Sequence, residues 1–142
     1  MASATLISIA LLAAPVAQSA TPHATASAFL DAFKAMDATR FDRFFAPDVT
    51  MFFPDGPFPT ERVEGQAAVL AAFHSFFDRV RERGRTTLNI MPLDQRIDQY
   101  GDVAVVTFRL DSADAVGRRS VVLRKDGGEW RIAHFHASTV DK

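Results

Sequence analysis

Two segments of the N-terminal half carry apolar residues at the spacing of an α-helix. In the first, Phe29 and Phe33 belong to a row of apolar side chains that predicts an amphipathic helix over residues 25–37. The second segment follows Gly65 and has the clearest period in the chain. Its apolar positions, which would share one helix face, are Val69, Leu70, Phe73, Phe76, Phe77 and Val80. Both helices are therefore expected to pack one face against a common core.

The remaining elements are predicted from shorter patterns. A short helix is expected over residues 41–47 and a strand over residues 48–53, which ends at a Pro-Asp-Gly-Pro turn. The C-terminal half has no helical period, and its apolar runs are separated by turn residues. They predict an antiparallel meander of strands at residues 86–98, 102–111, 116–125 and 129–139. Helices followed by a sheet indicate an α+β domain.

The predicted strand at residues 102–111 is apolar on both faces. Between Val103 and Phe108, residues of both parities are largely apolar, and alternate residues of a strand face opposite sides. The predicted helices can cover only one of these faces. We therefore expect a second copy of the chain to cover part of the other face, so that the protein is a homodimer.

Composition limits the classes of function. The chain has 142 residues, of which 48% are hydrophobic and 13 are phenylalanine, and this suits one domain with a large core. The 16 Lys and Arg residues nearly balance the 17 Asp and Glu residues, and no long basic cluster occurs, so we expect no nucleic-acid partner. The absence of cysteine excludes thiol nucleophiles, disulfides and cysteine-ligated zinc.

The N-terminus has the pattern of a secretory signal. Residues 1–20 contain no charged side chain, and every charged residue of the protein follows them. An apolar run too short to span a bilayer precedes a small-x-small triplet at residues 17–19. We expect residues 1–19 to be a signal peptide and residues 20–142 a mature domain that is periplasmic or secreted, with no membrane association after cleavage. A plain N-terminal membrane anchor is the alternative.

Two motifs and the element order carry a family resemblance. Residues 124–138 read RKDGGEWRIAHFHAS, and residues 63–69 read VEGQAAV. They resemble SnoaL-like domains of the nuclear transport factor 2-like superfamily, and the tail is also similar to the association domain of calcium/calmodulin-dependent protein kinases of type two. The resemblance spans residues 20–142. It implies a cone-shaped, cystatin-like fold in which N-terminal helices pack inside a curved antiparallel sheet.

The predicted last strand supplies the candidate chemistry. Strict alternation would place Trp130, His134 and His136 on one face, toward the helices. The two imidazoles are then either pocket-wall groups satisfied by hydrogen bonds or the catalytic groups, which hold a ligand or transfer a proton. The H-x-H pair offers only two metal ligands, with His74 as a candidate third, so we assign no metal and no cofactor.

A pocket inside the cone is expected to be lined mainly by aromatic rings. The expected lining residues are Phe29, Phe33, Phe53, Phe73, Phe77, Trp130 and Arg119. Arg118 and Arg119 are adjacent in a strand, so one of the two faces the cone. Kinase-association relatives bury arginines that bind small carboxylates, and the resemblance implies an anion partner for this side chain.

The sequence leaves more than one function open. The resemblance places the base of ketosteroid isomerases at the position that Phe53 occupies here, and phenylalanine cannot act as that base. We expect the protein to bind a small, mostly apolar organic molecule in the Phe- and His-lined pocket. One alternative is a cofactor-free lyase, isomerase or cyclase with a histidine as acid or base. Another is a non-catalytic dimerisation module.

Overall fold

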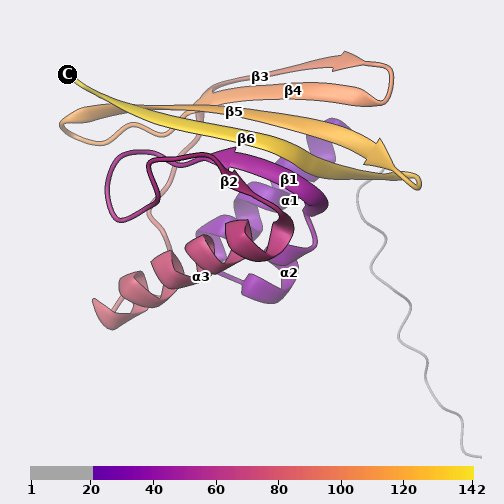
Figure 1. Ribbon diagram of the computed structural model, residues 1–142. Helices are drawn as coiled ribbons and strands as arrows, with labels where there is room; N and C mark the ends of the chain where they lie inside the picture. The colour runs from indigo at the N-terminus through magenta and orange to yellow at the C-terminus, as the bar shows by residue number, and fades with distance from the viewer. Residues whose placement is uncertain (1–20) are drawn as a thin grey trace, which may run out of the picture.

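The computed structural model describes residues 21–142, and the expected signal peptide lies outside these residues. The helices and strands follow one another in an order close to the expected one (Figure 1). They are α1 (Pro22–Ala35), α2 (Ala38–Asp42), β1 (Phe45–Phe52), β2 (Val63–Glu64), α3 (Gln66–Glu82), β3 (Leu93–Tyr100), β4 (Val103–Arg109), β5 (Ala115–Asp126) and β6 (Glu129–Asp141).

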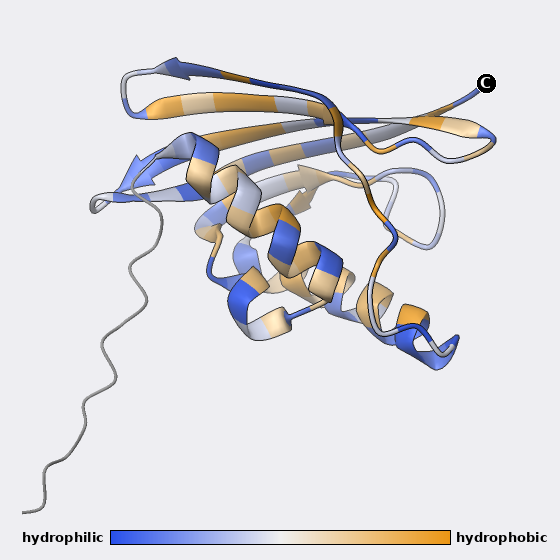
Figure 2. Ribbon diagram, turned by 180° about the vertical axis from the view of Figure 1, so that it is seen from behind, coloured by the Kyte–Doolittle hydropathy of each residue, from blue (hydrophilic) through white to orange (hydrophobic). Residues whose placement is uncertain are grey.

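The strands form one six-stranded sheet in the order β2-β1-β6-β5-β4-β3. Strands β1 and β6 pair in parallel, and the other four pairings are antiparallel. The three helices lie on one side of the sheet, which we call the inner face, and leave the outer face uncovered (Figure 1). Figure 2 shows β4 as a largely hydrophobic strand beside the more hydrophilic β3. The architecture is the expected α+β arrangement of helices against a curved sheet.

Two element boundaries differ from the expected positions, one for a local reason and one for a long-range reason. Helix α1 begins earlier because the Thr21 hydroxyl accepts a hydrogen bond from the Ala24 N–H at 3.2 Å, and Pro22 suits the first helical turn. The predicted helix over residues 41–47 was wrong beyond residue 42. The reason is long-range pairing, because the Ile132 N–H donates to the Phe44 carbonyl at 2.6 Å and draws the chain into the sheet.

Residues 86–92 are not the start of a strand, although the pattern predicted one. They connect α3 to β3 and cross beside α1, where the Leu88 N–H donates to the Lys34 carbonyl at 2.8 Å. The Leu88 side chain is buried in the core. This connection therefore closes one side of the space between helices and sheet.

Phenylalanine rings form the centre of the core. Phe41, Phe45 and Phe77 are fully buried, and the ring centroid of Phe41 lies 5.0 Å from that of Phe45 and 5.3 Å from that of Phe77. These separations are typical of favourable aromatic pairs. These rings fill the space where α2 and α3 approach β1.

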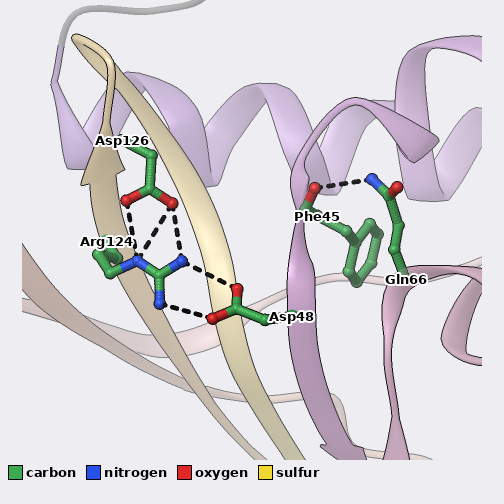
Figure 3. A network of polar contacts seen from close by, with 5 residues as sticks. All are labelled: Phe45, Asp48, Gln66, Arg124 and Asp126. Atoms are coloured by element: carbon green, nitrogen blue, oxygen red, sulfur yellow. Dashed lines mark hydrogen bonds and ion pairs between the residues drawn. The ribbon is translucent and has the colours of Figure 1, made fainter.

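Polar contacts connect β1 to β5, across β6, and to the start of α3 (Figure 3). Arg124 of β5 donates to Asp126 on its own strand and to Asp48 on β1, each at 2.9 Å. Hydrogen bonds to these two carboxylates raise the pKa of Arg124, and the guanidinium in turn lowers the pKa of both carboxyls. The Gln66 side chain donates to the Phe45 carbonyl at 2.9 Å and holds the start of α3 against β1.

A β-bulge in β6 reverses the side-chain pattern of the last strand. His134 pairs with Val122 and Ile132 pairs with Leu123, so Ala133 is an additional residue between these pairs. Ile132 is fully buried on the inner face, whereas His136, three pairs later, is exposed on the outer face. The expectation that Trp130 and both histidines share one face is therefore wrong.

Candidate functional site

An apolar cavity of about 320 Å³ lies between the helices and the inner face of the sheet. Its walls come from α1, α3, β1 and the segment after it, the connection before β3, β4 and the residue after it, β5 and β6. The lining residues are Phe29, Leu30, Phe33, Met51, Phe53, Pro54, Asp55, Phe58, Phe73, Phe76, Leu88, Ile90, Phe108, Leu110, Arg119, Phe135, Ala137 and Thr139. The volume is at the lower end of the range for small-molecule pockets, about 300–1,000 Å³.

The structure brings five of the expected pocket residues together at this cavity. They are Phe29, Phe33, Phe53, Phe73 and Arg119. Phe77 and Trp130 do not line it, because Phe77 packs among the rings of the core and Trp130 is buried before the bulge of β6. Phe135 and Ala137 take the inner positions that sequence alternation assigned to the histidines.

Arg119 is the one cationic side chain among the lining residues. Its Nη1 donates to the carbonyl oxygens of Arg118 at 2.8 Å and Ser138 at 2.9 Å. Within residues 21–142 no carboxylate forms an ion pair with it. Burial lowers the pKa of Arg119, although a guanidinium remains protonated at neutral pH. The cavity therefore contains a positive charge that is not ion-paired within the described residues, and Asp55 is the one acidic side chain in the same lining.

The sheet register fixes where this charge lies. Arg119 on β5 pairs with Phe108 on β4 and with Ala137 on β6, and all three line the cavity. A Cβ atom at Gly117 would collide with the Leu110 carbonyl oxygen and lie 3.1 Å from Nη2 of Arg119. Glycine at this position thus allows the guanidinium to lie close to the backbone of its own strand. Sequence analysis gave no signal for this role of Gly117.

The segment after β1 forms another wall. The Phe58 ring stacks on the Phe53 ring with centroids 4.7 Å apart and lies 5.4 Å from the Phe76 ring. Arg79 of α3 donates from Nη2 to the Pro57 carbonyl at 3.3 Å. The cavity wall here includes Asp55, which belongs to the Pro-Asp-Gly-Pro turn that the sequence predicts after the strand. Asp55, Arg119 and Thr139 are the lining residues with polar side chains.

None of the described histidines lines the cavity. On the outer face, His134 Nδ1 lies 2.8 Å from the Thr50 hydroxyl, and burial, then His136 and Arg62, lower the pKa of His134. On the helical side, His74 Nε2 lies 2.8 Å from an Asp42 carboxylate oxygen, so it cannot complete a site with the other two. Residues 21–142 contain no group of three or more His, Cys, Asp or Glu side chains placed to hold a metal ion.

The fold is similar to that of nuclear transport factor 2-like proteins, and it encloses an apolar cavity that contains Arg119. The chain belongs to the SnoaL-like domain family, whose model matches residues 23–142. None of the curated proteins matches it in sequence. In the part of the chain that the structure describes, no helix is long and apolar enough to cross a membrane.

Solved structures share the fold. A proposed calcium/calmodulin-dependent protein kinase type II association domain from Thiobacillus denitrificans is 26% identical, with a TM-score of 0.65 over 89% of this chain and 99% of that one. A ketosteroid isomerase-like protein from Erwinia carotovora atroseptica is 19% identical, with a TM-score of 0.67 over 84% and 94%. A nuclear transport factor 2-like protein of unknown function from Pseudomonas putida is 20% identical, with a TM-score of 0.64 over 80% of each chain.

Proposed function

We propose that the protein binds a small, mostly apolar organic molecule that carries an anionic group. The observation that supports this is the Arg119 guanidinium, which has no carboxylate partner in a cavity of about 320 Å³. Apolar walls favour an apolar ligand body, because removing it from water is favourable in proportion to the area buried. A carboxylate or sulfonate at Arg119 would then supply the missing counter-charge.

The contribution of the charge can be bounded. A hydrogen bond to a charged group contributes about 1.5–3 kcal/mol, which corresponds to roughly 10-fold to 100-fold in affinity. The aromatic walls at Phe33, Phe73 and Phe108 do not distinguish an acid from its neutral analogue. We therefore assign ligand selectivity to Arg119 and the bulk of the affinity to the rings.

Placement of the histidines does not support the enzymatic alternative. A histidine acid or base would need to reach the bound molecule, and His134 and His136 lie on the opposite face of the sheet. Asp55 lines the cavity, and it forms no ion pair within residues 21–142. Binding without turnover is the function that this geometry supports best.

We also propose that the protein is a homodimer. Four side chains form an apolar group on the uncovered outer face of β3, β4 and β5, and we call this group the valine stripe. Its members are Tyr100, Val103, Val105 and Val122, which lie in paired positions of neighbouring strands. Tyr100 is 69% and Val103 38% exposed. A second copy covering this stripe would remove that apolar area from water.

Export is proposed as well, because residues 1–19 read as a signal peptide. N-terminal sequencing of the protein from its native host should give a chain that begins near Ala20. A soluble cytoplasmic chain that begins at Met1 would contradict export.

Mass spectrometry of molecules that remain bound through purification tests the binding function. Wild type and an Ala137→Leu variant, in which the added carbons occupy the cavity, are denatured and their released molecules compared. We expect an apolar acid that is present with the wild type and absent with the variant. A retained molecule that is equally abundant with both proteins would contradict binding in this cavity.

A further inference from the structure

The outer face of the sheet carries a pair of imidazoles that the cavity does not use. His134 and His136 lie two residues apart on β6, after the bulge, and project from the same face. Their partners on β1 are Thr50 and Phe52, which therefore share this face. The Phe52 ring centroid lies 6.3 Å from that of His134 and 5.7 Å from that of His136. The imidazoles thus share one apolar neighbour.

The hydrogen bond of His134 orients its ring. Nδ1 lies 2.8 Å from the Thr50 hydroxyl oxygen, so this nitrogen is engaged and Nε2 is left for another partner. Within residues 21–142 His136 has no hydrogen bond or ion pair that would hold its ring, and its side chain is exposed. One imidazole is therefore held by a hydrogen bond, whereas the other contacts the Phe52 ring and has its ring nitrogens exposed to solvent or to a ligand.

The spacing suits a chelate. Residues i and i+2 of a strand are separated by about 6.6 Å along it, with side chains parallel, and imidazole nitrogens bind metal ions at about 2.0–2.1 Å. We propose that His134 and His136 bind one divalent transition-metal ion between them, with Thr50 as the positioning residue. In metal-binding histidines, one ring nitrogen binds the metal and the other typically forms a hydrogen bond with an oxygen atom, as Nδ1 of His134 does with Thr50.

The surroundings decide which metal binds and how tightly. No third His, Cys, Asp or Glu of the described residues completes the site, so water fills the other positions and binding is weaker than in a structural zinc site. Two imidazoles favour Cu²⁺ over Ni²⁺ and Zn²⁺, and exclude Mg²⁺. Arg62 acts electrostatically on His134, but it is paired with Glu64 at 2.7 Å. The Glu64 carboxylate therefore reduces the repulsion between Arg62 and a metal ion at His134.

Calorimetric titration of the full chain with CuCl₂, in a weakly coordinating buffer at neutral pH, tests the site. We expect one ion per chain, weaker binding of ZnCl₂ and none of MgCl₂. His134→Gln and His136→Gln should each weaken Cu²⁺ binding by at least about tenfold. The matched controls are His74→Gln and His23→Gln, which remove imidazoles from the helices and should leave the affinity unchanged.

Thr50 is tested through its effect on the metal. Thr50→Val should weaken Cu²⁺ binding by about tenfold and change the electron paramagnetic resonance spectrum of the bound ion, and Thr50→Ser should restore both. Thermal melting checks that each variant folds. If His134→Gln does not fold, the test rests on His136→Gln, because His136 is exposed. Unchanged affinity in His136→Gln, equal loss in His74→Gln, or no Cu²⁺ binding below millimolar concentrations would overturn the proposal.

Discussion

Filling the cavity should stabilise the protein. Ala137 lines the cavity, is 4% exposed, and lies beside Arg119 on the inner face. Ala137→Leu adds three carbons to empty space, and burial of about 0.8 kcal/mol per carbon gives at most about 2.4 kcal/mol. Ordering the leucine side chain costs about 0.5–1 kcal/mol. We expect a net gain of about 1.5 kcal/mol, or roughly 6 °C in melting temperature for a domain of this size.

A second alanine provides the matched control. Ala32 in α1 is fully buried, and it does not line the cavity. Ala32→Leu would overpack a dense region and should cost about 1–3 kcal/mol. Urea unfolding of wild type and both variants gives the free energies of unfolding. If Ala137→Leu destabilises as much as Ala32→Leu, the space beside Arg119 is not the open cavity that we describe, and the reasoning fails.

Three further predictions concern the backbone, the charge network and the assembly. Gly117→Ala should lower the free energy of unfolding by about 1–3 kcal/mol in urea titrations, because the Leu110 carbonyl must move; wild-type stability would contradict this. Arg124 lowers the pKa of Asp48 and Asp126 in the folded protein. The stabilisation of the folded protein by these contacts is therefore fully present above the pKa of an unfolded Asp, about 3.9, and is lost as pH falls through the lowered pKa values of the folded protein. Arg124→Gln should therefore destabilise at pH 7 and have little effect once the carboxyls are protonated, whereas equal deficits at both pH values would refute the coupling. Light scattering at micromolar concentration should give twice the mass of one chain, and a lysine within the valine stripe should give monomers; a monomeric wild type would refute the dimer.

Much of the fold follows from local patterns. The start of the helix after Gly65 and its apolar positions from Val69 to Val80 were predicted correctly, because the apolar side chains repeat regularly on one face that packs against the core. The rings of Phe29, Phe33 and Phe73 were placed at the cavity for the same reason. The parallel pairing of β1 with β6 could not be read from the sequence, because the pairing joins segments far apart in the chain.

The histidines were assigned to the wrong face of the last strand because one additional residue, Ala133, interrupts the alternation of side chains. Trp130 and Ile132 are apolar in one phase, and Phe135 and Ala137 are apolar in the other. This change of phase is the sequence signal of a bulge, and it was available before the structure. Reading the strand as strictly regular placed the histidines at the cavity. The bulge at Ala133 instead gives the inner positions to apolar side chains and the outer positions to the imidazoles.

Calorimetric titration with a matched pair of ligands tests the central claim most directly. 4-Phenylbutyrate and 4-phenylbutyramide have nearly the same shape and differ in charge. The wild type should bind the acid at least about tenfold more tightly than the amide, and Arg119→Met should abolish this preference while it still binds the amide. Equal affinities in the wild type, or a preference for the acid that survives in Arg119→Met, would contradict the assignment of Arg119 as the anion partner in the cavity.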